Sequence, residues 1–216
     1  MRIPKHIGVI PDGNRRWAQN NGMSKEMGYV EGLNPGLELF KTCRKMGVEE
    51  ITYYGFTVDN TKRPSIQTNA FTKACVDAVK MLENEDASLL VVGNYKSPMF
   101  PEELKKYTTR QDFGKADMKV NFLVNYGWNW DLGNLKFDEA TTNRNRIIEN
   151  IHSKDISRLD LIIRWGGRRR LSGFLPVQSI YADFYVVDDY WPDFKAGHIH
   201  EALNWYETQD VTLGGW

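Results

Sequence analysis

Short apolar runs alternate with longer amphipathic stretches through most of this chain, and this alternation limits the folds open to it. Apolar runs predict six strands, at residues 7–10, 51–56, 89–92, 120–124, 161–163 and 184–187. Helical spacing and helix-start signals predict helices at 34–46, 71–82, 101–107 and 196–206, and another in the second half of the polar region 131–158. Such alternation is typical of parallel sheets. We therefore expect a single α/β domain over residues 1–216, with a mainly parallel six-stranded sheet and helices on both faces.

The balance of charge disfavours a nucleic-acid partner. The 216 residues carry 28 Lys and Arg against 28 Asp and Glu, so any anion site has to come from local clustering. Cys43 and Cys75 lack metal-type spacing and fall in helical patterns, which indicates free, buried thiols in a reducing compartment. No segment resembles a signal peptide, and no apolar run approaches the ~20 residues of a membrane span. We expect a cytoplasmic protein, with peripheral contact to a membrane surface left open.

The first predicted strand ends in a compact polar segment. Pro11-Asp12-Gly13-Asn14 follows it at once, and Arg15-Arg16 comes next at the opening of a helical stretch. Open α/β sheets bind ligands at the carboxyl ends of their strands, so a carboxylate, an amide and two guanidiniums are expected there. Mg²⁺ is usually held by one or two carboxylates together with substrate phosphates, and arginine forks hold phosphate oxygens. The segment predicts a site for a magnesium-bound polyanion, although Asp-Gly-Asn is equally a good turn sequence.

Three further polar clusters follow predicted strands. Taken alone, residues 57–64 are more typical of a solvated loop that ends at a proline, and the two tryptophans in 125–131 favour a cap over the core. The strongest cluster is 164–172, which contains Arg164, Arg168, Arg169, Arg170 and Ser172 around a pair of glycines. Guanidiniums crowded at one strand end repel each other unless an anion relieves them, so an anion site is favoured there over a solvated basic run. The chain has no Walker loop, G-x-G-x-x-G fingerprint, paired-histidine zinc motif or nucleophile elbow.

These segments, in this order, resemble the cis-prenyltransferase family, whose best-known members make undecaprenyl diphosphate. The resemblance is carried by residues 6–17, 54–64, 125–127, 161–178, 181–183 and 191–194, and it covers nearly the whole chain. It implies a parallel α/β sheet with a hydrophobic tunnel, usually in a homodimer. It also implies Mg²⁺-dependent joining of isopentenyl diphosphate, or a similar C5 unit, to a short allylic prenyl diphosphate. Magnesium and cationic groups would stabilise the leaving diphosphate while an alkene attacks carbon 1 and a proton is lost.

Carried over residue by residue, the resemblance predicts a site for two diphosphates. Asp12 would be the magnesium carboxylate, and Asp183 stands where a glutamate helps to bind the metal. The predicted catalytic residues are Asp12, Asn14 and Arg16. The predicted substrate-binding residues are Gly13, Arg15, Trp17, Lys25, Tyr29, Thr57, Asn60, Arg63, Arg164, Arg170 and Ser172. Arg63 would hold the allylic diphosphate with Asn14 and Arg16. Arg164, Arg170 and Ser172 would hold the second diphosphate.

Several residues depart from the family pattern close to these positions. Tyr29 replaces a histidine, Arg168 replaces a glutamate, and residues 211–215 lack the usual arginine. These departures keep three alternatives open: irregular head-to-middle coupling; cyclisation or hydrolysis of one prenyl diphosphate, as in a terpene synthase; and a non-catalytic partner subunit that binds prenyl diphosphate. A phosphate-binding protein of unrelated activity is a fourth. Because such partner subunits tend to lose the first aspartate, the presence of Asp12 favours an enzyme.

Overall fold

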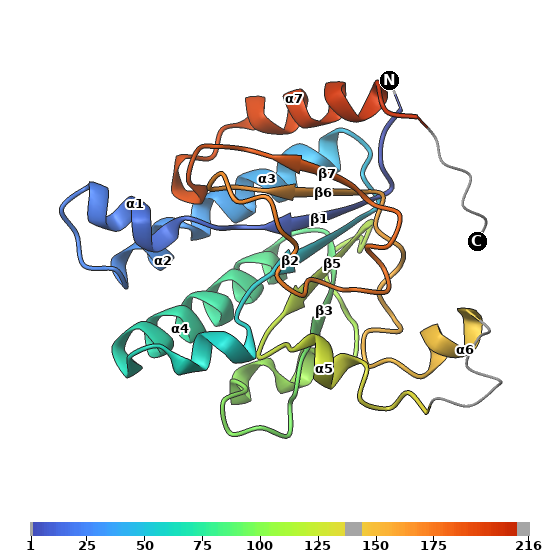
Figure 1. The fold of residues 1–216 in the computed structure, drawn as a ribbon, viewed down its shortest axis with the longest axis horizontal. Coiled ribbons are helices and arrows are strands. Elements are labelled where there is room, and N and C mark those ends of the chain that lie inside the picture. The colour runs from blue at the N-terminus through green and yellow to red at the C-terminus, as the bar shows by residue number, and fades with distance from the viewer. Residues whose placement is uncertain (1, 137–143, 211–216) are drawn as a thin grey trace.

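The computed structural model describes residues 2–136 and 144–210, which form one domain around a central sheet (Figure 1). In the described part of the chain the strands are β1 (His6–Ile10), β2 (Glu50–Tyr54), β3 (Ala87–Val92), β4 (Gln111–Asp112), β5 (Met118–Leu123), β6 (Leu161–Arg164) and β7 (Asp183–Val186). Their order is β4-β3-β5-β2-β1-β6-β7, and every pair is parallel except β3 with β4. The six predicted strands are confirmed. The prediction omitted β4, which is a polar edge strand of only 2 residues and offers no apolar run.

Three long helices cover one face of the sheet. They are α3 (Leu33–Lys45), α4 (Ser65–Met81) and α7 (Ala196–Glu207), and their buried side chains pack with those of β1, β2, β3, β5 and β6 in one large core. The shorter helices are α1 (Asn14–Asn20), α2 (Met27–Glu31), α5 (Trp128–Asp131) and α6 (Arg144–Glu149), with 3-10 turns at η1 (Val58–Lys62), η2 (Leu82–Asn84), η3 (Glu102–Thr108) and η5 (Trp191–Asp193). The departure at residues 211–215 lies outside the described residues. No helix in residues 2–136 and 144–210 has the length and apolar character needed to cross a bilayer.

The other face of the sheet is covered mainly by irregular segments that flank β6, which corrects the expectation of helices on both faces. Phe174 and Leu175 are fully buried there against Ile10 and Ile162. Gly8 makes this close packing possible, since a Cβ at that position would lie 2.5 Å from the Phe174 ring. A segment that packs so tightly on bare strand backbone leaves no room for a helix above β1.

The parallel register brings the carboxyl ends of β1, β2 and β6 to one edge of the sheet. Ile10 of β1 pairs with Arg164 of β6, and β2 lies on the other side of β1. Beyond this edge β1 continues into α1 and α2, which project from the body of the domain (Figure 1). Beyond the same edge β2 continues through η1 into α4. Three predicted polar clusters are thus placed side by side.

Candidate active site

A polar cavity of about 540 Å³ opens at this edge of the sheet. Most of the predicted site residues line it: Asp12, Gly13, Asn14, Arg15, Arg16, Lys25, Tyr29, Thr57, Asn60, Arg63, Arg164, Arg170 and Ser172. Arg168, Tyr54, Asp59 and Phe71 also line it but were not in the predicted set. Residues from α1, the η1 region and the segment after β6 therefore meet around one space.

Asp12 is the counter-charge of a buried arginine in this cavity. Its Oδ2 accepts a hydrogen bond from Arg164 Nη2 at 2.7 Å, and its Oδ1 lies 3.3 Å from Arg16 Nη2. The Arg164 side chain is only 5% exposed, whereas that of Asp12 is 31% exposed. Burial opposes ionisation of Asp12, but the hydrogen bond and charge of Arg164, with the charge of Arg16, outweigh it and lower the pKa of the carboxyl. Asp12 is therefore an anion at neutral pH.

The segment after β6 wraps around the Arg164 side chain. Arg164 Nη1 donates to Ser172 Oγ at 3.1 Å and also to the carbonyl of Arg170. Arg16 Nη1 donates to the carbonyl of Gly166 at 2.9 Å, which ties α1 to this segment. Gly166 has a φ of +81°, and a Cβ there would lie 2.6 Å from Arg16 Nη2, so glycine is the residue that fits. The turn thus orients two arginines toward one cavity.

A third arginine of the cavity, Arg63, contacts the stacked aromatic pair of Tyr29 and Phe71. Arg63 Nη1 donates to the Tyr29 hydroxyl at 2.9 Å. The Tyr29 ring stacks on Phe71, with centroids 4.5 Å apart and planes 2° from parallel. Burial raises the pKa of Tyr29, while Arg63 and Arg15 act in the opposite direction, so the hydroxyl stays protonated at neutral pH. Asn60 is used locally, because its Oδ1 accepts from the Thr57 backbone N–H at 3.0 Å and shapes the η1 turn.

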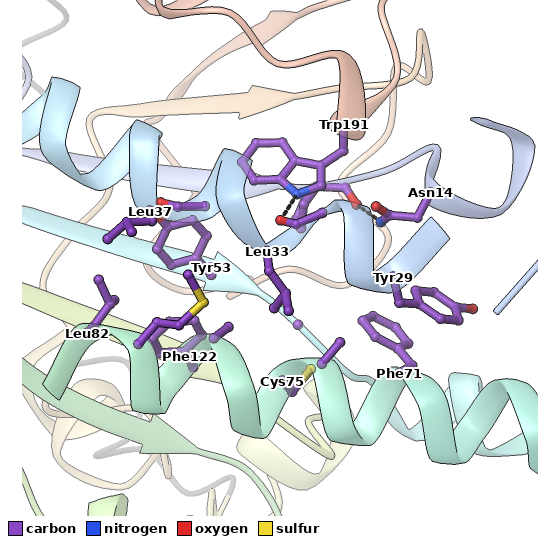
Figure 2. Close-up of a pocket in the computed structure, with 17 residues that line it drawn as sticks. Asn14, Tyr29, Leu33, Leu37, Tyr53, Phe71, Cys75, Leu82, Phe122 and Trp191 are labelled. Carbon is purple, nitrogen blue, oxygen red and sulfur yellow. Dashed lines mark hydrogen bonds between the residues drawn. The ribbon is translucent and has the colours of Figure 1, made fainter. Parts of the chain in front are cut away.

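An apolar cavity of about 80 Å³ adjoins the polar one, and Figure 2 shows the residues that line it. Side chains of α3, α4, η2, β2 and β5 line it, among them Leu37, Tyr53, Cys75, Leu82 and Phe122. Five residues line both cavities: Pro11, Asn14, Tyr29, Gly55 and Phe71. Asn14 Nδ2 donates to the carbonyl of Pro11 at 2.9 Å, while its buried Oδ1 has no partner among the described residues.

The structure does not bring two predicted residues to the cavity. Trp17 Nε1 donates to Asp193 Oδ1 at 2.7 Å, and Trp17 is not among the lining residues. Asp183 pairs with Leu161 at the amino ends of β7 and β6, the opposite edge of the sheet from Asp12. The expected metal pair of Asp12 and Asp183 is therefore not formed within one chain. The described residues also contain no cluster of three or more His, Cys, Asp or Glu side chains that could hold a metal.

Sequence reasoning missed the second role of several core aromatics. Phe71 was placed on the apolar face of a helix, yet it lines both cavities. Trp191 also lines the apolar cavity, and its indole N–H donates to the carbonyl of Gly32 at 2.8 Å (Figure 2). The only sign in the sequence that such a residue lines a cavity is its position near a predicted polar cluster. Many residues that are buried in the core have the same position.

Comparison with known proteins agrees with this arrangement. The family model described as "Putative undecaprenyl diphosphate synthase" matches residues 10–214. The chain is 29% identical to ditrans,polycis-undecaprenyl-diphosphate synthase ((2E,6E)-farnesyl-diphosphate specific) of Aliivibrio fischeri, over 98% of this chain and 89% of the relative. It is 30% identical to an isoprenyl transferase of Clostridium perfringens, over 99% of this chain and 91% of the relative.

The fold is also similar to a solved structure. Lavandulyl diphosphate synthase from Lavandula x intermedia, in complex with dimethylallyl diphosphate, superposes with a TM-score of 0.84 over 98% of both chains at 21% identity. Only the fold follows from a likeness at that identity. The match of the family model over nearly all residues goes further: this chain belongs to the undecaprenyl diphosphate synthase, or cis-prenyltransferase, family.

Proposed function

We propose that this protein is a magnesium-dependent prenyltransferase that joins isopentenyl diphosphate, or a similar C5 unit, to a short allylic prenyl diphosphate and releases diphosphate. The observation that carries the proposal is the junction of the two cavities. A prenyl diphosphate is an anion with an apolar tail, and the arginine-lined cavity opens onto the apolar one through five shared residues. One substrate can therefore occupy both, with its reacting carbon beside Asn14, Tyr29 and Phe71.

The charge in the polar cavity is sufficient for two diphosphates. Its cationic lining residues are Arg15, Arg16, Lys25, Arg63, Arg164, Arg168 and Arg170, against the carboxylates of Asp12 and Asp59. The arginines on α1 and before α4 would hold the allylic diphosphate, whose tail then enters the apolar cavity. Those after β6 would hold the second diphosphate together with Ser172. Forked contacts of this kind suit phosphate oxygens.

The apolar cavity favours a short tail. At about 10–15 Å³ for each water-sized group, the cavity of about 80 Å³ takes roughly five to eight heavy atoms. That is one isoprene unit to about one and a half. A dimethylallyl tail would fit with little rearrangement, a geranyl tail would extend slightly beyond this volume, and a farnesyl tail requires the walls formed by α3 and α4 to move apart.

The donor set at Asp12 suits magnesium only together with substrate. One carboxylate is available in the cavity besides the exposed Asp59, and Mg²⁺ commonly takes one or two carboxylates plus substrate phosphates. Asp12 would hold the ion together with the substrate, and the chemistry supplied would be neutralisation of the charge that develops on the leaving diphosphate. Arg16 and Arg63 would stabilise the same charge while the C1–O bond breaks. The alkene of the C5 unit then attacks carbon 1, and loss of a proton sets the new double bond.

Arg168 supports a second candidate, irregular coupling of two allylic diphosphates or cyclisation or hydrolysis of one. Arg168 adds a cation to the cavity where the resemblance implies a glutamate. Arg168 belongs to the segment after β6, so this cation changes the environment of the second substrate and not that of the leaving diphosphate. A non-catalytic partner subunit is less well supported, because an ionised Asp12 and a formed tail cavity are both present.

Product analysis tests these proposals. Purified protein with Mg²⁺ is incubated with dimethylallyl, geranyl or farnesyl diphosphate, each with and without isopentenyl diphosphate, and products are identified by mass. Regular chain extension needs both substrates, whereas coupling, cyclisation or hydrolysis proceeds with the allylic one alone. Asp12→Ala should lose turnover with its circular dichroism unchanged. If none of the substrate combinations gives a product, the enzyme proposal is contradicted. Light scattering of the same preparation tests the proposed homodimer.

A further inference from the structure

A polar triad, buried except for the 51% exposed side chain of Asp189, uses no residue that lines either cavity. His198 is on α7, Trp165 follows β6, and Asp189 follows β7. Trp165 Nε1 lies 3.3 Å from His198 Nδ1, and His198 Nε2 lies 3.1 Å from Asp189 Oδ2. His198 is 7% exposed and Trp165 is fully buried. A histidine placed this way bridges two segments that are distant in the sequence.

The neighbours of the imidazole determine its tautomer. The indole N–H of Trp165 and the backbone N–H of Lys195, also 3.3 Å away, are donors only, so His198 Nδ1 has to be the acceptor. The proton of the neutral ring is then on Nε2, where it is donated to the Asp189 carboxylate. These contacts therefore match the Nε2-protonated tautomer of His198, with Nδ1 as the acceptor.

The triad is connected to the site through the glycine turn. The backbone carbonyl of Asp189 accepts from Gly166 N–H at 2.8 Å, and the carbonyl of Gly166 accepts from Arg16 Nη1 at 2.9 Å. Arg16 in turn lies 3.3 Å from Asp12. Trp165, held by His198, also packs edge-to-face on Trp191 of the apolar cavity, with centroids 4.9 Å apart. Two connections therefore run from His198 toward the two cavities.

We propose that His198 is a positioning residue of the diphosphate site: by holding Trp165 and Asp189 together it fixes the Gly166 turn, and the turn keeps Arg16 in place for the diphosphate. This inference rests on the proposed function in one respect, which is that Arg16 binds a diphosphate. His198 itself does not touch the ligand.

Protonation of His198 opposes this arrangement. A second ring proton on Nδ1 would face two N–H donors, although it would strengthen the contact with Asp189. The charged groups around the ring are Asp189 and, 3.9 Å from that carboxylate, the Lys195 ammonium. The side chains that α3 buries near α7 are apolar apart from Cys43, whose burial raises its pKa to about 12. A doubly protonated ring should therefore release Trp165 and weaken diphosphate binding.

Calorimetric titration with inorganic diphosphate and Mg²⁺ tests the inference. His198→Phe should bind about two- to tenfold more weakly than wild type, the change expected for one lost hydrogen bond. His198→Asn keeps an acceptor for Trp165 but cannot be protonated, so it should bind like wild type at pH 8. Because diphosphate itself titrates, the ratio of the wild-type to the His198→Asn affinity is compared at each pH, and it should fall as the pH is lowered from 8 to 5.5. His200→Phe, an exposed residue of the same helix, is the matched control.

The outcomes separate this inference from the proposed function. If the wild type binds no diphosphate, the proposed function fails first. If the wild type binds it and His198→Phe equals His200→Phe at every pH, the inference is overturned, even where the melting temperature of His198→Phe is lower. Nitrogen-15 NMR of the wild type adds a measurement that needs no variant: an Nδ1-protonated His198 would overturn the inference, and the Nε2-protonated form supports it.

Discussion

Replacing Asp12 with asparagine should destabilise the fold through Arg164. The asparagine keeps the shape of the side chain but removes the charge 2.7 Å from a guanidinium that is only 5% exposed. Loss of one partner of a fully buried pair costs about 3–5 kcal/mol, and an exposed pair is worth about 0–1 kcal/mol. Because the Asp12 side chain is 31% exposed, the expected loss lies between these limits, at roughly 1–3 kcal/mol.

Urea and thermal unfolding measure that loss. For a chain of this size each kcal/mol lowers the melting temperature by about 2–4 °C. Asp59→Asn is the matched control, because Asp59 lines the same cavity but its one ion pair among the described residues is with Lys62, and the two side chains are 84% and 76% exposed. Its free energy of unfolding should change by less than about 0.5 kcal/mol.

The effect of Asp12→Asn on the affinity for diphosphate should depend on whether Mg²⁺ is present. In the wild type Mg²⁺ should strengthen binding, since Asp12 and the phosphates share the ion. In Asp12→Asn the cavity gains one net positive charge, so diphosphate without Mg²⁺ should bind at least as tightly as to the wild type, and added Mg²⁺ should help less. A variant with wild-type stability and the wild-type response to Mg²⁺ would refute the assignment of Asp12 as both counter-charge and metal ligand.

Three further outcomes are expected. Tyr29→Phe keeps the stack on Phe71 but loses the 2.9 Å bond to Arg63, so the KM of the allylic substrate should rise about two- to tenfold, measured by steady-state kinetics. Ala78→Leu fills the apolar cavity, so titration should show weaker prenyl diphosphate binding and unchanged inorganic diphosphate binding. Burial lowers the pKa of His6 below 6.5, so the unfolded chain takes up a proton that the folded one does not; the free energy of unfolding should fall between pH 7.5 and 5.5, and less so in His6→Gln.

The fold was largely predictable because its strands are apolar runs bounded by turns. β1, β3 and β6 lie within two residues of their predicted ends, since each is buried along its length. Of the two helices after β1, α1 was predicted only as the opening of a helical stretch, without bounds, and α2 was not predicted. α1 buries only Ala18, so it carries no apolar stripe, and its position depends on tertiary contacts such as Trp17 with Asp193.

The polar half of the site was predictable for a geometric reason. Residues that directly follow parallel strands meet at one edge, so clusters after β1, β2 and β6 had to converge. The apolar half was not, because Phe71 and Trp191 have the same pattern as core residues that line nothing. Which arginine would take Asp12 as its partner also depends on side-chain packing, and Arg164 is selected by being buried between Asp12 and Ser172.

Arg164 also explains why metal and substrate should bind together. Without ligand, Asp12 accepts from Arg164, and that contact is the main compensation for a buried guanidinium. A metal ion that took Asp12 alone would leave Arg164 uncompensated, and Asp183 could not help to hold it, since that residue lies at the other edge of the sheet. An arriving diphosphate removes both obstacles, because its oxygens can pair with Arg164 and complete the coordination of the ion. The single carboxylate is therefore sufficient once the anion is present, and the affinity for Mg²⁺ should rise with the concentration of diphosphate.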